Sequence, residues 1–192
     1  MSAQQERKDH PIRTPMQCSN CSKAAKIVHG NYHFKESGLD NVILCGIELI
    51  QCDHCGNEDP VIPAMNELFR TIALAIVTKP YRLAGEEVRF LRKYLALTGD
   101  KFSRLLHIDK TTLSKWENNE DPVGTQSDLA IRMLIMSQDK ALREKIAEVV
   151  NESFEKIQFD QGSERKRKRN KRYVPHRTTI EVNTADLSYA YA

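Results

Sequence analysis

Four cysteines in the first third of the chain have the type and spacing of metal ligands. They form two Cys-x-x-Cys pairs separated by thirty residues: Cys18, Cys21, Cys52 and Cys55. Two intervening residues let both thiolates of a pair reach one ion from a tight turn, and two such pairs complete a tetrahedral site. Gly56 follows the second pair, where such a turn often needs a positive φ angle. The pattern predicts one structural Zn²⁺ per chain.

The alternatives to a structural metal site are a redox-active pair and cysteines that only pack. A thioredoxin-like pair needs a single Cys-x-x-Cys motif in a βαβ context, which is missing here. Four thiolates leave no open coordination position, so catalysis by this metal is not expected. Cys45, the fifth cysteine, lies outside the pairs in a strand-like run. It is interpreted as a small core residue, with redox sensing as the alternative.

A second group of candidate residues lies in the segment HIDKTTLSKWENN, residues 107–119. Ile108 and Leu113 flank Asp109 with the spacing of a hydrophobic staple around a helix N-cap. Leu113 and Trp116 are three residues apart, so they share the inward face of the predicted helix. The preceding helix ends only a few residues earlier. The two helices therefore have helix-turn-helix spacing.

The polar side chains on the outer faces of this second helix are candidate DNA contacts. In a helix-turn-helix, the exposed N-terminal residues of the second helix enter the major groove. Hydroxyl, methyl and ammonium groups suit base edges and phosphates. The candidates are Lys110, Thr111, Thr112, Ser114, Lys115 and Asn118. The alternative is a plain helical bundle that binds no nucleic acid.

The elements that must position these groups are indicated by apolar periodicity. Between the cysteine pairs, YHF and NVILCGIELIQC are rich in branched and aromatic residues and predict short strands. The segment PAMNELFRTIALAIV carries one apolar stripe and predicts a helix that links two units. The stripe consists of Met65, Leu68, Phe69, Ile72, Ala73 and Ile76. Residues 83–157 then predict five helices and no strand, the first of the helix-turn-helix pair being capped by Thr98.

We therefore expect an α+β protein with two small units joined by a helix. The predicted divisions are a polar arm at 1–15, a β-rich zinc-binding domain at 16–60, a linking helix at 61–82, an all-α five-helix domain at 83–160 and a basic tail at 161–192. The TTIEV segment in this tail is assigned no firm structure, although it could add a strand to a sheet.

Charge is distributed unevenly along the chain. The segment ERKRKRNKR, residues 164–172, holds seven basic residues, whereas the whole chain carries a net charge of +3, so the rest carries −3. A run of this kind stays solvated or meets a polyanion. The candidate non-specific phosphate contacts are Arg165, Lys166, Arg167, Lys168, Arg169, Lys171 and Arg172. A solubilising or protein-binding arm is the alternative.

Composition and motifs argue against several classes of protein. No run of eighteen apolar residues is present, so no transmembrane helix is expected. The polar N-terminal residues do not have the pattern of a secretory signal. We therefore expect a cytoplasmic protein whose thiols stay reduced. An enzyme is not expected, because the sequence offers no nucleophile–base pair, phosphate loop or open metal site.

The segment TGDKFSRLLHIDKTTLSKWENN resembles the helix-turn-helix of lambda-repressor-like (XRE) regulators, in which the second helix ends in Trp-Glu-x-Gly. Gly99 stands where that family often has a Gln that touches DNA. His107 replaces the usual turn glycine and Asn119 replaces the glycine after Trp-Glu. Both residue types tolerate left-handed backbone better than most. Ser103 keeps the small residue that close helix approach needs.

Together the two halves resemble the MqsA-type (YgiT) antitoxin family, which carries CxxC…CxxCG followed by an XRE domain, over roughly residues 16–137. The resemblance implies a C-terminal domain that forms a homodimer and represses its own operon at a palindromic double-stranded DNA operator. It also implies a zinc domain that can hold a toxin protein. The family's base contacts carry over to Thr111 and Lys115. The alternatives are a stand-alone mobile-element or phage-type regulator without a toxin, and a redox- or metal-responsive regulator.

Overall fold

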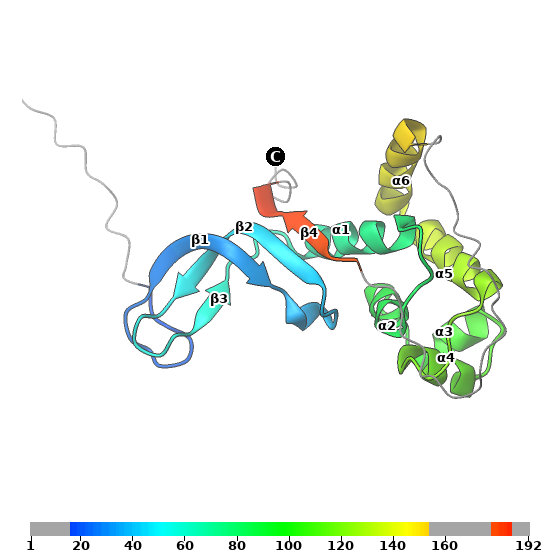
Figure 1. Ribbon diagram of the computed structural model, residues 1–192, viewed down its shortest axis with the longest axis horizontal. Coiled ribbons are helices and arrows are strands. Elements are labelled where there is room, and N and C mark those ends of the chain that lie inside the picture. The colour runs from blue at the N-terminus through cyan, green and yellow to red at the C-terminus, as the bar shows by residue number, and fades with distance from the viewer. Residues whose placement is uncertain (1–15, 154–177, 186–192) are drawn as a thin grey trace, which may run out of the picture.

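The computed structural model describes residues 16–153 and 178–185, with side-chain environments up to residue 147 in α6. Within these ranges a four-stranded sheet is followed by six α-helices, and the last strand returns from the C-terminal part of the chain to the sheet (Figure 1). The four paired cysteines lie together in the sheet unit. The coarse expectation of a small β-rich unit with four clustered cysteines, followed by helices, is thus confirmed. No helix in these described ranges combines the length and apolar character needed to cross a membrane.

The sheet is built around one long central strand, β2. The strands are β1 (Lys26–His33), β2 (Val42–Gln51), β3 (Glu58–Pro60) and β4 (Ile180–Asn183). β1 pairs antiparallel with one edge of β2. The other edge is divided between β3, which is antiparallel at residues 49–51, and β4, which is parallel at residues 42–45. The two strands predicted between the cysteine pairs are therefore present as β1 and β2.

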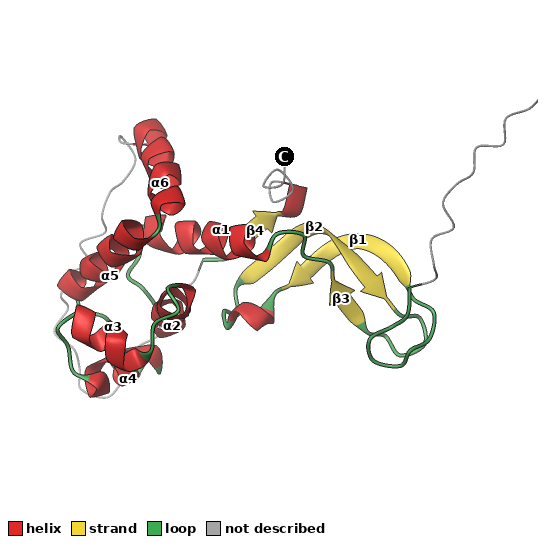
Figure 2. Ribbon diagram, turned by 180° about the vertical axis from the view of Figure 1, so that it is seen from behind, coloured by secondary structure: helices red, strands yellow, loops and turns green. Residues whose placement is uncertain are grey.

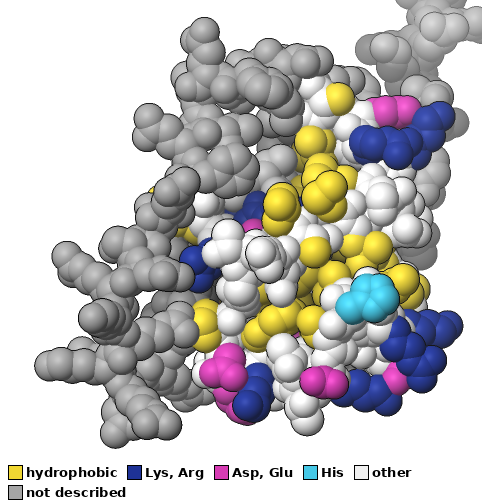
Figure 3. Space-filling view, turned by 90° about the vertical axis from the view of Figure 1, so that its right-hand side faces the viewer, with side chains coloured by type: hydrophobic (Ala, Val, Ile, Leu, Met, Phe, Trp, Pro, Cys, Tyr) yellow, Lys and Arg dark blue, Asp and Glu magenta, His cyan; other side chains and the backbone are white. Residues whose placement is uncertain are grey.

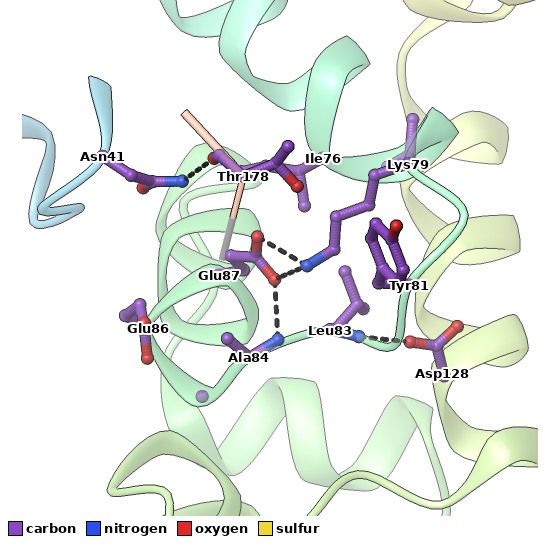
Figure 4. A network of polar contacts seen from close by, with 12 residues as sticks. Asn41, Ile76, Lys79, Tyr81, Leu83, Ala84, Glu86, Glu87, Asp128 and Thr178 are labelled. Carbon is purple, nitrogen blue, oxygen red and sulfur yellow. Dashed lines mark hydrogen bonds and ion pairs between the residues drawn. The ribbon is translucent and has the colours of Figure 1, made fainter. Parts of the chain in front are cut away.

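β4 brings the C-terminal part of the described chain back to the first unit. The Asn41 side-chain amide donates to the carbonyl of Thr178, just before the strand (Figure 4). Val182 is buried, and the Thr184 hydroxyl donates to the carbonyl of Cys45 at 3.0 Å. The hypothesis that TTIEV adds a strand is confirmed. Of the predicted tail at 161–192, residues 178–185 therefore lie at the sheet.

In the part of the chain that the structure describes, six α-helices follow the sheet, and the first of them links it to the others (Figure 1). They are α1 (Met65–Thr78), α2 (Gly85–Tyr94), α3 (Gly99–Leu105), α4 (Lys110–Glu117), α5 (Thr125–Gln138) and α6 (Lys140–Ser153), and a short 3₁₀ turn, η1 (Lys35–Ser37), follows β1. Leu68, Ile72 and Ile76 of the α1 stripe are fully buried. Met65 is 42% exposed, contrary to expectation. It is the first residue of the helix.

A buried ion pair fixes the joint between α1 and α2 (Figure 4). The ammonium of Lys79 lies 2.5 and 2.7 Å from the two carboxylate oxygens of Glu87. The same carboxylate accepts the backbone N–H of Ala84 at 2.6 Å. Burial raises the pKa of Glu87, although Lys79 opposes this shift. From α5, Asp128 accepts the N–H of Leu83 at 2.7 Å, so side chains from both sides hold the α1–α2 connection in place.

Candidate metal centre and nucleic-acid interface

Two loops with the same backbone pattern present the four cysteines at the end of the sheet farthest from the helices (Figure 2). In each loop the N–H of the first cysteine donates to the carbonyl five residues later, at 2.8 Å for Cys18 and 2.9 Å for Cys52. In each loop the residue after the second cysteine has a positive φ angle, 57° at Ser22 and 72° at Gly56. The expectation for Gly56 is confirmed. The equivalent role of Ser22 was not anticipated, because serine carries no such sequence signal.

The four sulfur atoms converge as the spacing predicted. All lie within 4.8 Å of one another, and none is in a disulfide. The Sγ atoms of Cys18 and Cys55 are 3.5 Å apart, and so are those of Cys21 and Cys52. Sulfur atoms bound tetrahedrally to one ion at about 2.3 Å stand roughly 3.8 Å apart. The residues therefore fit a four-thiolate metal site.

The local electrostatics of the cluster favour a bound cation. The backbone N–H groups of Cys55 and His54 point at the sulfur of Cys52 and lower its pKa to about 6. At Cys21 the N–H of Lys23 acts in the same direction, but burial and the neighbouring thiols outweigh it and raise the pKa to about 12. Four adjacent thiolates repel one another unless a cation neutralises them. The cluster therefore reaches its fully ionised form only with a metal ion.

Polar contacts outside the cysteines tie the two loops together. The hydroxyl of Ser19 in the first loop donates to Asp59 at 2.6 Å. The side-chain amide of Asn57 in the second loop donates to the same carboxylate at 2.8 Å. Such contacts orient metal-binding loops before the ion arrives. Cys45 lies apart from the cluster, half-buried in β2 opposite Asn183 of β4.

The second candidate site is the pair α3–α4, which a four-residue turn joins. His107 in this turn has φ 51°, and Asn119 after α4 has φ 55°, so the expected left-handed conformations are confirmed. The hydroxyl of Thr98 accepts the N–H of Lys101 at 3.3 Å and caps α3 as predicted. Asp109 occupies the N-cap position of α4, but its carboxylate makes no capping hydrogen bond. The start of α4 therefore has no side-chain cap, while Leu113 one turn later is buried and Ile108 before it is partly buried against the core.

α4 separates apolar from polar residues as its sequence predicts. Leu113 and Trp116 are buried. Of the candidate DNA contacts, Thr112 is half-buried and the others are exposed: Lys110, Thr111, Ser114, Lys115 and Asn118. The structure thus places five of the six on α4 and Asn118 directly after it, with the apolar face of the helix turned inward.

An arginine clamp attaches the C-terminal end of α4 to α2. The guanidinium of Arg92 donates to both carboxylate oxygens of Glu117, at 2.7 and 2.9 Å. Arg89 donates to the backbone carbonyl of Glu117 at 2.8 Å and to the side chain of Asn118 at 2.9 Å. Bidentate pairs of this kind are strong and directional. Asn118 is therefore already engaged by α2, and the clamp itself could not be foreseen from sequence spacing.

Charges around the exposed face of α4 are partly neutralised. Asp100 lies 2.5 Å from the ammonium of Lys110 and 2.9 Å from the guanidinium of Arg104. These cations lower the pKa of Asp100. Lys115 is 3.7 Å from Asp121, a longer contact between exposed groups. Lys115 is therefore less tightly paired than Lys110. Arg104, at the end of α3, adds a cation to this face that sequence reasoning did not include.

The seven candidate phosphate contacts at 165–172 lie outside the described residues. The arrangement of the remaining residues offers a four-thiolate metal centre at one end of the molecule. At the other end, an exposed polar helix face is held rigidly against α2 (Figure 1).

No protein-family model matches the chain, and no curated protein matches it.

Proposed function

We propose that the protein is a zinc-containing, sequence-specific DNA-binding repressor of the MqsA type, in which α3 and α4 form the helix-turn-helix. The observation that carries the proposal is the two-sided character of α4. Its apolar face is buried through Leu113 and Trp116, and its end is clamped by the arginines of α2. Its polar face is exposed. A rigid, exposed helix of this kind can enter a major groove without rearranging.

We propose Zn²⁺ as the ion of the four-thiolate centre. Four cysteine ligands in a tetrahedral arrangement favour zinc, and such a site stabilises the fold because the unfolded chain has no preformed cage. Four thiolates fill all four coordination positions of a tetrahedral ion, so none stays open and the role of the ion is structural. The cysteine loops and the α4 face lie at opposite ends of the molecule, which supports separate tasks for the two units (Figure 1).

Replacing Lys115 with alanine should weaken operator binding by about 1–3 kcal/mol and relax preference at one base pair per half-site. The physical reason is that an ammonium on the exposed face of the helix can donate to the acceptors of guanine. Thr111→Ala should weaken operator binding less, because a hydroxyl and a methyl group discriminate between bases more weakly than an ammonium does. Affinity for a selected operator and for random DNA would be measured by fluorescence anisotropy.

The matched control for Lys115 is Lys35→Ala, which removes an exposed ammonium from η1 at a distance from the helix pair. It should leave operator affinity and melting temperature unchanged. If Lys115→Ala binds both the operator and random DNA with wild-type affinity, α4 is not the element that recognises the base sequence.

We also propose that the basic run at 164–172 adds affinity without sequence information. Each neutralised phosphate steepens the slope of the logarithm of the binding constant against the logarithm of the salt concentration by about 0.9. Replacing its seven basic residues with glutamine should therefore weaken binding to all DNA alike and flatten the salt slope. Substitution is preferable to truncation, because a truncation would also remove β4 from the sheet. Unchanged salt slopes would favour the alternative of a solubilising or protein-binding segment.

A second copy of the chain is proposed to cover an apolar face of α5. Figure 3 views the molecule from this side and shows hydrophobic side chains gathered there. Leu129 and Met133, one turn apart on α5, are 53% and 57% exposed. Exposed apolar groups this close together often mark a protein interface. A homodimer would present two copies of α4 to the two halves of a palindromic operator.

Met133→Glu should convert a dimer into a monomer in sedimentation velocity experiments, because it places a carboxylate in the proposed apolar interface. The matched control is Met65→Glu, at an exposed methionine on α1 away from this face. A monomeric wild-type chain, or a dimer that survives Met133→Glu, would contradict the proposed interface.

An antitoxin role is proposed on the resemblance to the MqsA type, with the cysteine-bearing unit as the part that holds the toxin. The test is co-expression with the product of the adjacent gene. If that product arrests growth, this chain should relieve the arrest and co-purify with it. A neighbouring product that is harmless, or that does not associate, would leave a stand-alone regulator as the function.

A further inference from the structure

A cavity of about 720 Å³ lies where four parts of the chain meet. Its walls come from η1 in the sheet unit, from α1 and α2, and from the corner between α5 and α6. The volume is within the range of pockets that bind small molecules, roughly 300–1,000 Å³. The proposed metal centre and DNA-reading face do not use this cavity, since none of their residues lines it.

Three aromatic side chains from α1 and α2 form one side of the cavity. The rings of Phe69 and Phe90 meet edge to face with centroids 6.0 Å apart. The rings of Phe90 and Tyr94 are nearly parallel, with centroids 6.5 Å apart. The three rings therefore form an apolar wall of ring faces and ring edges, and a further aromatic ring can pack against such a wall in an edge-to-face or offset arrangement.

The polar groups beside these rings are already paired with one another. Asp139 accepts hydrogen bonds from the hydroxyl of Tyr94 and from the guanidinium of Arg70. Arg70 also binds Glu67, which accepts from Lys145 at 3.2 Å. Two cations and two carboxylates thus neutralise each other. This wall is polar and fixed, but it offers a ligand no net charge.

The charge that remains available at the cavity is positive. Lys93 is exposed and forms no ion pair with any residue in the described ranges. Lys140, at the start of α6, has only a 3.8 Å contact with Glu144, and both side chains are largely exposed. The one lining carboxylate outside the neutral wall, Glu36, accepts a hydrogen bond from Tyr32 at 2.7 Å. The rim therefore favours an anionic group on the ligand.

We infer that this cavity binds a small aromatic acid, with its rings on Phe69, Phe90 and Tyr94 and its anionic group beside Lys93. The ligand would touch η1 of the sheet unit and the α5–α6 corner of the helical unit together. A bound ligand would therefore hold the sheet unit and the helical unit in a fixed position relative to each other. This inference does not depend on DNA binding or on the identity of the metal, and it can be tested without either.

The test compares two fluorescent probes on the full chain with its metal. One is 8-anilinonaphthalene-1-sulfonate, an aromatic acid, and the other is N-phenyl-1-naphthylamine, its uncharged counterpart. The sulfonate should bind saturably, with one site per chain. Lys93→Gln should weaken sulfonate binding roughly fivefold, the effect of about 1 kcal/mol for a partly exposed ion pair, and leave binding of the amine unchanged.

Two further variants locate the binding. Gln138→Trp adds bulk at an exposed lining residue and should weaken both probes. Lys101→Gln removes an exposed ammonium from α3, outside the cavity, and should affect neither. Circular dichroism identifies any variant that fails to fold. Probe binding that is unsaturable, or that neither Lys93→Gln nor Gln138→Trp changes, would overturn the assignment. An equal loss of both probes in Lys93→Gln would exclude an acid as the ligand.

Discussion

Cys52→Ser should release the metal ion and unfold the sheet unit while α2 to α5 keep their helical signal. Cys52 is one of the four clustered cysteines that could hold the metal ion, and it also begins the second cysteine loop. A serine hydroxyl is a much weaker zinc ligand than a thiolate, and structural zinc sites contribute on the order of 10 kcal/mol to folding. The zinc content found by metal analysis should fall from one equivalent per chain to nearly none. Circular dichroism should show loss of strand signal with helical signal retained.

The matched control is Cys45→Ser, which changes the one cysteine outside the cluster. It should retain one equivalent of zinc and the full strand signal. Less than half an equivalent of zinc in freshly purified, reduced wild-type protein would contradict the assignment of the metal. Retention of zinc by Cys52→Ser would contradict the four-ligand arrangement.

Gly85→Ala should lower the free energy of unfolding by about 3 kcal/mol or more, although it adds only a methyl group. A Cβ atom at residue 85 would stand 2.0 Å from the backbone carbonyl oxygen of Trp116. The obstacle is backbone, so it cannot rotate away, and α2 would have to move from α4. That movement would also disturb the hydrogen bond from the Gly85 N–H to Asn119. Urea unfolding followed by the fluorescence of Trp116 would measure the loss.

Gly99 provides the control for this effect, because it occupies the same first position in α3 as Gly85 does in α2. A Cβ at residue 99 would only touch Leu113, at an ordinary 3.8 Å. Gly99→Ala should therefore leave stability unchanged or raise it by roughly 0.4–1 kcal/mol. Equal stability of the two variants would mean that α2 and α4 are not held this closely in solution.

Features encoded by neighbouring residues were predictable from the sequence. The two Cys-x-x-Cys pairs require only local turns, and the thirty residues between them form the hairpin of β1 and β2 that brings the loops together. Leu113 and Trp116 were placed inward by helical period alone. His107 and Asn119 adopt left-handed backbone because the turn geometry requires it and their side chains permit it.

Features that depend on distant parts of the chain were not predictable. β4 pairs with β2 across 138 residues, as Val42 opposite Ile180 shows, and four residues carry too little pattern to specify a partner strand. The Glu117 clamp needs two arginines from another helix, and nothing in their spacing indicates this use. The closeness of α2 to α4 at Gly85 follows from helix packing, which sequence periodicity does not describe.

The return of β4 to the sheet also sets an order of events during synthesis. All four cysteines have been made by residue 55, so a metal ion can close that end of the sheet early. The edge of β2 at residues 42–45 stays open until residue 183 follows, on the order of ten seconds later at ribosomal speed. An unpaired strand edge is a template for other chains. The sheet unit is therefore synthesised first and completed last. Where several ribosomes translate one messenger RNA, the open β2 edges of neighbouring nascent chains would lie close enough to pair with one another.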